Sequence, residues 1–168
     1  MRRYLLDTTL LAGYLQGKLQ AVALITPWLD AHEASTSILV YGEISEYLMG
    51  CPDFAFRDGQ LRKLLQEVTP FFLSYAILRR YASIRRQLRP PRGSGLVGDI
   101  DTLIAATALE SDLIVVTTDS DYTRVPDLNV MLLDRQSLSP RLPNNNPGKW
   151  QIAVSTRSYE VGNDPQGV

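Results

Sequence analysis

The chain has 168 residues, a formal net charge of −1 at pH 7, one cysteine and one histidine. This length predicts a single domain whose hydrophobic core needs no disulfide or structural metal. The lone cysteine, Cys51, excludes an intrachain disulfide and is typical of a reducing cytosol. No apolar run approaches the ~18 residues of a membrane-spanning helix. We therefore expect a cytoplasmic protein without a membrane partner.

The residue counts also restrict the chemistry. His32 is the only histidine and lies in a polar stretch, so no Cys/His zinc cage can be assembled. An enzyme of this composition must depend on carboxylates, whose hard oxygens favour Mg²⁺ or Mn²⁺. Because the net charge is close to zero, a surface that binds nucleic acid would have to gather its basic side chains locally.

Short apolar runs alternate with longer segments of helical periodicity. The expected strands are residues 3–6, 34–36, 71–75, 113–118 and 130–133. The expected helices are residues 8–15, 20–31, 38–49, 54–67, 76–88 and 99–110. Thr8 or Thr9 is a candidate cap for the first helix, and Ser37 for the third. This alternation predicts an α/β fold with a parallel sheet and helices packed on it.

Two segments rich in proline divide the chain further. Residues 89–98 contain two prolines and three glycines, which predicts a loop. Residues 139–149 contain three prolines and a run of asparagines, which is typical of a linker. Beyond the linker, apolar residues alternate at Trp150, Ile152 and Val154. We therefore expect a domain of residues 1–138 and a polar extension of residues 139–168, partly disordered, or forming an added edge strand or a partner-binding segment.

Acidic side chains follow two of the expected strands. Asp7 comes directly after residues 3–6, and Asp119 comes directly after residues 113–118. Open parallel α/β sheets bind ligands outside the carboxyl ends of their strands, so these two aspartates share one edge of the sheet. An aspartate after a strand is also a common turn residue or helix cap, and Asp121 in the same polar turn has the same ordinary explanation.

Three more carboxylates belong to expected helices. Glu43 borders the apolar stripe of residues 38–49, where a surface glutamate is the ordinary interpretation. Asp99 and Asp101 open the helix of residues 99–110, where aspartate stabilises a helix N-terminus. We expect Asp99 to be the N-cap and Asp101 to lie on the face that approaches the sheet. Taken together the carboxylates indicate a site, because crowded like charges are costly unless a cation neutralises them.

A divalent cation held by carboxylates can activate a water and stabilise charge that develops during phosphoryl chemistry. Two other carboxylate-based α/β classes fit less well. A haloacid-dehalogenase-type phosphatase needs a second aspartate two positions after the first, where this chain has Thr9. A phospho-accepting receiver domain needs a lysine near a late strand, whereas this chain has none between Lys63 and Lys149.

Four segments resemble the motif regions of PIN-domain nucleases, most closely the VapC-type toxins of bacterial toxin–antitoxin pairs. They are LLDTT at residues 5–9, YGE at residues 41–43 after Ser37, DTLIAATAL at residues 101–109 and VTTDSDY at residues 116–122. The order and spacing of these segments cover residues 3–133, and the third segment is the most specific. The resemblance implies a three-layer α/β/α domain around a central parallel sheet.

The resemblance further implies an endoribonuclease that depends on Mg²⁺ or Mn²⁺. Its acidic site would consist of Asp7, Glu43, Asp101 and Asp119, both as catalytic residues and as metal ligands. Asp99 and Asp121 are further candidate ligands, and Thr9 matches a Ser/Thr position near the metal. Many such toxins are dimers held inactive by a small antitoxin, so the resemblance also implies an antitoxin partner and a homodimer.

A basic cluster precedes the acidic helix. Six arginines lie within fourteen positions, at Arg79, Arg80, Arg85, Arg86, Arg89 and Arg92. Guanidinium groups bind phosphates well, so these arginines are candidates for RNA binding. A solvated helix face and contact with an acidic partner peptide are alternatives for the same cluster.

The leading hypothesis is therefore a toxin-type ribonuclease that hydrolyses RNA phosphodiester bonds. One alternative is a PIN-domain nuclease in RNA processing or DNA repair without an antitoxin. Another is a non-catalytic module that binds RNA or protein, which is disfavoured because all four acidic positions retain Asp or Glu.

Overall fold

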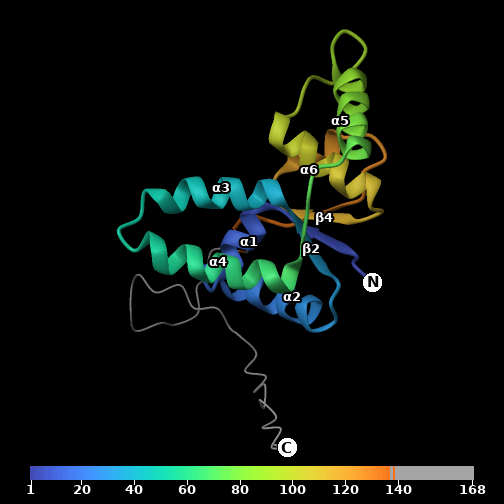
Figure 1. The fold of residues 1–168 in the computed structure, drawn as a ribbon. Coiled ribbons are helices and arrows are strands. Elements are labelled where there is room, and N and C mark those ends of the chain that lie inside the picture. The colour runs from blue at the N-terminus through green and yellow to red at the C-terminus, as the bar shows by residue number, and fades with distance from the viewer. Residues whose placement is uncertain (137, 139–168) are drawn as a thin grey trace, which may run out of the picture.

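The computed structural model describes residues 1–136 and 138. The expected linker and the alternating segment at Trp150, Ile152 and Val154 lie outside the described residues. The described part consists of a parallel sheet with helices on both sides (Figure 1). This arrangement confirms the α/β class and the central parallel sheet.

The sheet has five parallel strands in the order β3-β2-β1-β4-β5. They are β1 (Tyr4–Leu6), β2 (Ala34–Ser37), β3 (Pro70–Phe71), β4 (Ile114–Thr117) and β5 (Val130–Leu132). The central strand β1 is buried along its whole length, which explains its uninterrupted apolar run. In the register Leu6 lies beside Thr36 of β2 and Val116 of β4, so the carboxyl ends of these three strands meet at one edge.

Helices fill the connections between the strands. They are α1 (Thr8–Leu15), α2 (Leu19–Asp30), α3 (Ile38–Met49), α4 (Phe54–Val68), α5 (Tyr75–Leu88), α6 (Asp99–Glu110) and the short 3₁₀ helix η1 (Ser120–Arg124). Figure 1 shows α5 and α6 packed together on one side of the sheet, with α1, α2 and α4 on the other. Among the described residues, no helix is long and apolar enough to cross a membrane.

The helix termini correct some details of the sequence prediction. Ser37 caps α3 as expected, accepting a hydrogen bond from the backbone N–H of Leu39 at 3.3 Å. The N-cap position of α1 is Asp7, not Thr8 or Thr9, because the helix begins directly after the strand. The expected strand over residues 71–75 ends at Phe71, because Ser74 caps α5 by accepting the N–H of Ile77 at 3.3 Å.

Candidate active site

The pairing of β1 with β4 sets the centre of the site. Asp7 follows β1 directly, and its backbone N–H donates to the carbonyl of Val116 on β4 at 3.1 Å. This bond places Asp7 beside Thr117, the last residue of β4. The Asp7 side chain is only 4% exposed. A buried carboxylate requires hydrogen-bond donors, and the neighbouring elements supply them.

Three hydroxyl groups hold the Asp7 carboxylate. Thr117 Oγ1 donates to its Oδ2 atom at 2.8 Å, and Thr9 Oγ1 approaches the same atom at 3.3 Å. The hydroxyl of Tyr122 lies 3.2 Å from Oδ1. These donors come from β4, α1 and η1, so three separate elements fix the orientation of one carboxylate.

Asp101 lies in the first turn of α6 and faces the same centre. Its Oδ1 atom is 3.3 Å from the Tyr122 hydroxyl, which therefore touches both Asp7 and Asp101. The preceding Gly98 makes room for this carboxylate. A Cβ atom at position 98 would lie only 2.7 Å from Asp101 Oδ2, whereas ordinary contacts begin near 3.4 Å.

Burial is the main cause that raises the pKa of Asp101 above its ordinary value, followed by the charge of Asp7. The charges of Asp119 and Glu43 raise this pKa further, and the Tyr122 hydrogen bond lowers it. Asp7, Glu43 and Asp119 thus all lie close enough to Asp101 for their charges to act on its pKa.

The two remaining carboxylates of this group are also oriented by neighbours. Glu43, on α3, accepts a hydrogen bond at Oε2 from the hydroxyl of Thr8 on α1. Asp119 caps η1, because its Oδ1 atom accepts the backbone N–H of Asp121 at 2.8 Å. Its own backbone N–H donates to Thr117 Oγ1 at 3.0 Å, so Thr117 links Asp7 with Asp119.

Asp99 turns away from this group. The expectation that Asp99 caps α6 is wrong, because Gly98 occupies the N-cap position and Asp99 is already helical. Two positions correspond to about 200° around an α-helix, so Asp99 and Asp101 face different neighbours. Asp99 Oδ1 accepts from the Tyr81 hydroxyl at 3.0 Å and pairs with Arg85 at 2.5 Å, both on α5.

Asp121 is likewise engaged elsewhere, in an ion pair of 3.1 Å with Arg124. Arg124 also donates from Nη2 to the carbonyl of Gly95 at 2.6 Å, with Ser94 and Leu96 carbonyls at 3.2 and 3.5 Å. Asp121 therefore helps to hold the loop before α6. It does not take part in the contacts that surround Asp7.

Three hydroxyl residues of the site were not singled out from the sequence: Thr8, Thr117 and Tyr122. Thr117 carries a visible signal, since it is a polar residue within a strand that is otherwise apolar and buried. Tyr122 carries a weaker one, an aromatic residue three positions after Asp119 in a polar turn. Thr8 carries none beyond its place next to Asp7.

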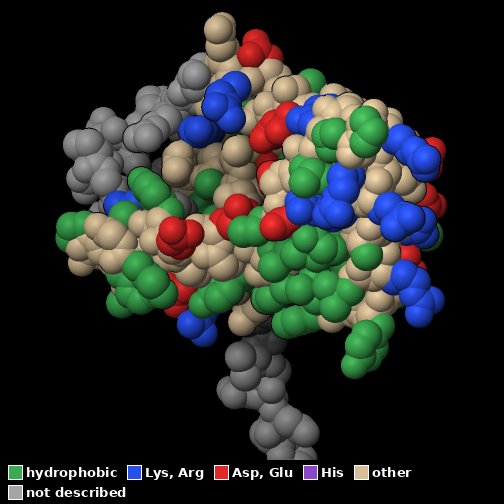
Figure 2. Space-filling view, turned by 90° about the horizontal axis from the view of Figure 1, so that it is seen from above, with side chains coloured by type: hydrophobic (Ala, Val, Ile, Leu, Met, Phe, Trp, Pro, Cys, Tyr) green, Lys and Arg blue, Asp and Glu red, His purple; other side chains and the backbone are tan. Residues whose placement is uncertain are grey.

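No basic side chain of the described part of the chain neutralises the charge of the site. Within residues 1–136 and 138, none of Asp7, Glu43, Asp101 and Asp119 forms an ion pair with a basic side chain. In a view from above Figure 1, acidic side chains lie in the middle of the face, and basic side chains gather on the side of α5 (Figure 2). Oxygen donors with uncompensated negative charge suit a hard divalent cation.

The spacing of the acidic side chains fits a cation less well than their charge does. No group of three or more His, Cys, Asp or Glu side chains in the described part of the chain is gathered closely enough to hold a metal ion. The charge and the donor type of the four carboxylates therefore fit a metal, while their present spacing does not form a finished coordination shell.

Comparison with known proteins agrees with this architecture. The sequence model of the PIN domain matches residues 4–128, and the chain therefore belongs to the PIN-domain family. The chain is 25% identical to Ribonuclease VapC4 of Mycobacterium tuberculosis over 135 residues, which are 79% of this chain and 98% of that protein.

The solved structures that share the fold include two VapBC structures. One is VapBC2 from Rickettsia felis bound to a promoter DNA fragment, with a TM-score of 0.69 and 18% identity, covering 78% of this chain and 98% of the other. The second is DNA-bound VapBC from Salmonella typhimurium, with a TM-score of 0.69 and 17% identity over the same shares of the two chains. The domain thus shares its fold with chains of these VapBC structures.

The raised pKa of Asp101 predicts that Asp101→Asn increases the thermal stability of the fold, and that this increase depends on pH. An acid whose pKa is raised by folding destabilises the fold when it is ionised, and this cost disappears below the unfolded-state value of about 3.9. In EDTA, Asp101→Asn should therefore raise the thermal unfolding midpoint at pH 7, and the gain should shrink as the pH falls toward 4. Thermal unfolding followed by circular dichroism across this range measures the effect.

Asp99→Asn is the matched control, because Asp99 is ion-paired with Arg85. It should give no gain at pH 7. An Asp101→Asn variant no more stable than the wild type at pH 7 would contradict the crowding of charge at Asp101.

Proposed function

We propose that the chain is a metal-dependent endoribonuclease that hydrolyses RNA phosphodiester bonds and is the toxin of a toxin–antitoxin pair. The observation that carries this proposal is the set of four carboxylates near the carboxyl edge of the sheet, which have no basic partner among residues 1–136 and 138. Membership of the PIN-domain family and the similarity to Ribonuclease VapC4 support it. The proposed catalytic and metal-binding residues are Asp7, Glu43, Asp101 and Asp119.

These four carboxylates would hold Mg²⁺ or Mn²⁺, which supplies an activated water and neutralises charge on the phosphate during hydrolysis. The chain's own residues provide the preorganisation. Thr117 and Thr9 fix the Asp7 carboxylate, and Thr8 fixes Glu43, so these groups lose little conformational freedom when they bind. The concentrated negative charge also disfavours approach of RNA phosphates until a cation offsets it.

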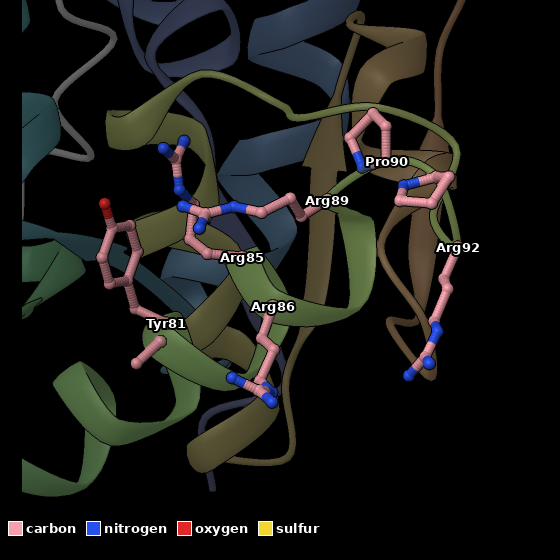
Figure 3. Close-up of a pocket in the computed structure, with 8 residues that line it drawn as sticks. Tyr81, Arg85, Arg86, Arg89, Pro90 and Arg92 are labelled. Carbon is pink, nitrogen blue, oxygen red and sulfur yellow. The ribbon is translucent and has the colours of Figure 1, made fainter.

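Arginines on α5 and the following loop would hold the RNA backbone. Arg85, Arg86, Arg89 and Arg92 line a hollow of about 660 Å³ together with Tyr81, Ala82, Pro90 and Pro91 (Figure 3). Arg86, Arg89 and Arg92 have no carboxylate partner among the described residues, so their guanidinium groups are available for phosphates. Arg85 already pairs with Asp99.

The other two arginines of the cluster lie apart. Arg79 and Arg80 line a separate hollow of about 370 Å³ with Ala76, Ser83 and Glu110. Arg80 pairs with Glu110 at 3.4 Å. The single cluster expected from the sequence is therefore divided in two, and we assign the phosphate contacts chiefly to the hollow near Arg86 and Arg89.

An antitoxin and a second copy of the chain are the proposed protein partners in the cytoplasm. A structure of similar fold, VapBC-5 from Mycobacterium tuberculosis, belongs to the VapBC family of toxin–antitoxin systems, which supports an antitoxin partner. Large apolar side chains are exposed around the start of α5, with Phe72 69% and Tyr75 91% exposed. Exposed apolar surface of this kind marks protein contacts more often than chance.

Cleavage of single-stranded RNA should require a divalent cation and Asp7. The purified chain should lose activity in EDTA and recover it with Mg²⁺ or Mn²⁺. Asp7→Asn should lower the rate at least ~100-fold by removing a charged ligand, while the fold remains intact by circular dichroism. Gel analysis of labelled RNA measures both effects.

Asp112→Asn provides the control, since Asp112 is an exposed turn residue and should retain full activity. Cleavage that persists after thorough chelation would overturn the metal requirement. Loss of folding in parallel with activity would make Asp7 a structural residue.

Gly98→Ala should impair the site without straining the backbone. The φ angle of Gly98 is −51°, which any residue can adopt, but the new Cβ would meet Asp101 Oδ2 at 2.7 Å and displace the carboxylate. Moving a catalytic group by about 1 Å can lower the reaction rate by about 100-fold. The rate of RNA cleavage at saturating metal is the measurement.

The matched control is Gly59→Ala in α4, where nothing lies within 4 Å of the added Cβ. This variant should keep its activity and gain stability from the better helix propensity of alanine. Equal rates for Gly98→Ala and the wild type would show that Asp101 needs no such space.

Replacing Arg86 and Arg89 with alanine should weaken RNA binding more than the chemical step. Each lost phosphate contact removes roughly one unit from the slope of log affinity against log salt concentration. Binding of uncleaved RNA to the inactive Asp7→Asn chain, measured at several salt concentrations, gives this slope.

Arg62→Ala with Lys63→Ala removes the same charge from the exposed surface of α4 and serves as the control. An unchanged slope for the Arg86 and Arg89 variant would assign this hollow to a protein partner.

A further inference from the structure

One buried hydroxyl connects two elements of the acidic site. Tyr122 is completely buried, and its hydroxyl lies 3.2 Å from Asp7 Oδ1 and 3.3 Å from Asp101 Oδ1. Asp7 follows β1, and Asp101 belongs to α6, on a different part of the chain. Within the described residues, Tyr122 is the one side chain that contacts two of the four carboxylates. Its position therefore relates the two carboxylates to each other.

Hydrogen bonds of the residues before and after Tyr122 in the chain fix its position. Asp119 caps the start of η1 by accepting the N–H of Asp121, and the N–H of Val125 donates to the Tyr122 carbonyl at 3.1 Å. Arg124 anchors the same turn to the carbonyl of Gly95. The hydroxyl is thus carried on a short segment that is hydrogen-bonded within itself and to the loop before α6.

The hydroxyl also remains a donor. A tyrosine phenol keeps its proton at neutral pH. A phenol has one proton and can donate fully to one carboxylate at a time. With both Oδ1 atoms in range, the single proton reduces the repulsion between the two carboxylates and keeps them facing the same point.

We propose that Tyr122 is a positioning residue of the acidic site, whose hydroxyl holds the Asp7 and Asp101 carboxylates toward one point, so that they need less rearrangement to bind a divalent cation. This inference rests on the proposed function, because it assumes that the two carboxylates are metal ligands. The aromatic ring of Tyr122 has a separable role in filling the core. Phenylalanine preserves that ring and removes only the contact with the carboxylates.

The test is Mn²⁺ binding to Tyr122→Phe, measured by isothermal titration calorimetry. Loss of a group that orients metal ligands typically weakens metal affinity ~10- to 100-fold, and we expect a loss in this range. Tyr81→Phe is the matched control, because the Tyr81 hydroxyl also donates to an aspartate, Asp99, at 3.0 Å, outside the acidic group. Its Mn²⁺ affinity should equal that of the wild type.

Cleavage kinetics provide a second readout. The Mn²⁺ concentration for half-maximal activity of Tyr122→Phe should rise by the same factor as the dissociation constant, while saturating Mn²⁺ should restore most of kcat. A variant with unchanged Mn²⁺ affinity would overturn the inference. Reduced kcat at saturating Mn²⁺ with unchanged half-saturation would do the same.

Tyr122→Leu separates positioning from stability. It removes both the ring and the hydroxyl, so it should be less stable than Tyr122→Phe but bind Mn²⁺ equally weakly. Affinity losses that follow the unfolding midpoints of the two variants, or a Tyr122→Phe chain that does not fold, would make the tyrosine a stabilising residue only. If the wild type itself binds no Mn²⁺, the proposed metal-dependent function fails together with this inference, and that result is distinct from a failure confined to the variant.

Discussion

The parallel pairing of β1 with β4 is the constraint from which the acidic site is built. It places Asp7 beside Thr117, and Thr117 in turn accepts the backbone N–H of Asp119. Two aspartates that are more than one hundred positions apart in the sequence are thereby related through a single threonine hydroxyl. Any change in the register of these two strands would separate them, because each strand residue alternates in the face that it presents.

Around this centre, the carboxylates accept hydrogen bonds from neutral hydroxyl groups and form no ion pairs with basic side chains of the described residues. Hydroxyl groups of Thr8, Thr9, Thr117 and Tyr122 orient the carboxylates without cancelling their charge. The arginines of the basic cluster lie instead on α5 and the loop after it, where Arg85 takes up the charge of Asp99. This separation of signs leaves the acidic centre electrostatically unsatisfied, a state that suits a cation better than a structural salt bridge.

Much of this arrangement could be predicted from the sequence, because strand ends and helix starts are local signals. Asp7 and Asp119 follow apolar runs, and the sheet edge then brings them together. Asp99 was misjudged because its partners, Tyr81 and Arg85, lie on another helix and leave no local trace. Thr117 did leave a local signal, as a polar residue in an apolar strand, and Tyr122 a weaker one. Neither signal names the carboxylate that the hydroxyl meets, because that carboxylate lies on another element.

The arginine cluster shows that the sequence alone does not predict which charged side chains share a surface. Arg80 and Arg85 are five positions apart on one helix, yet they pair with opposite ends of α6, at Glu110 and Asp99. Closeness in sequence therefore did not mean a common surface. Helix rotation and the antiparallel packing of α5 against α6 decide which arginines share a hollow, and neither can be read from the count of charges.

The contacts of Arg124 have a consequence for how the sequence can vary among related chains. Its guanidinium group reaches the carbonyls of residues 94–96, and only Val97 separates this anchor from Gly98, the N-cap of α6. An insertion or deletion within that short span would rotate or shift the first turn of α6 relative to η1. Length changes should therefore be tolerated before Ser94 and excluded after it, even though both parts belong to the same loop.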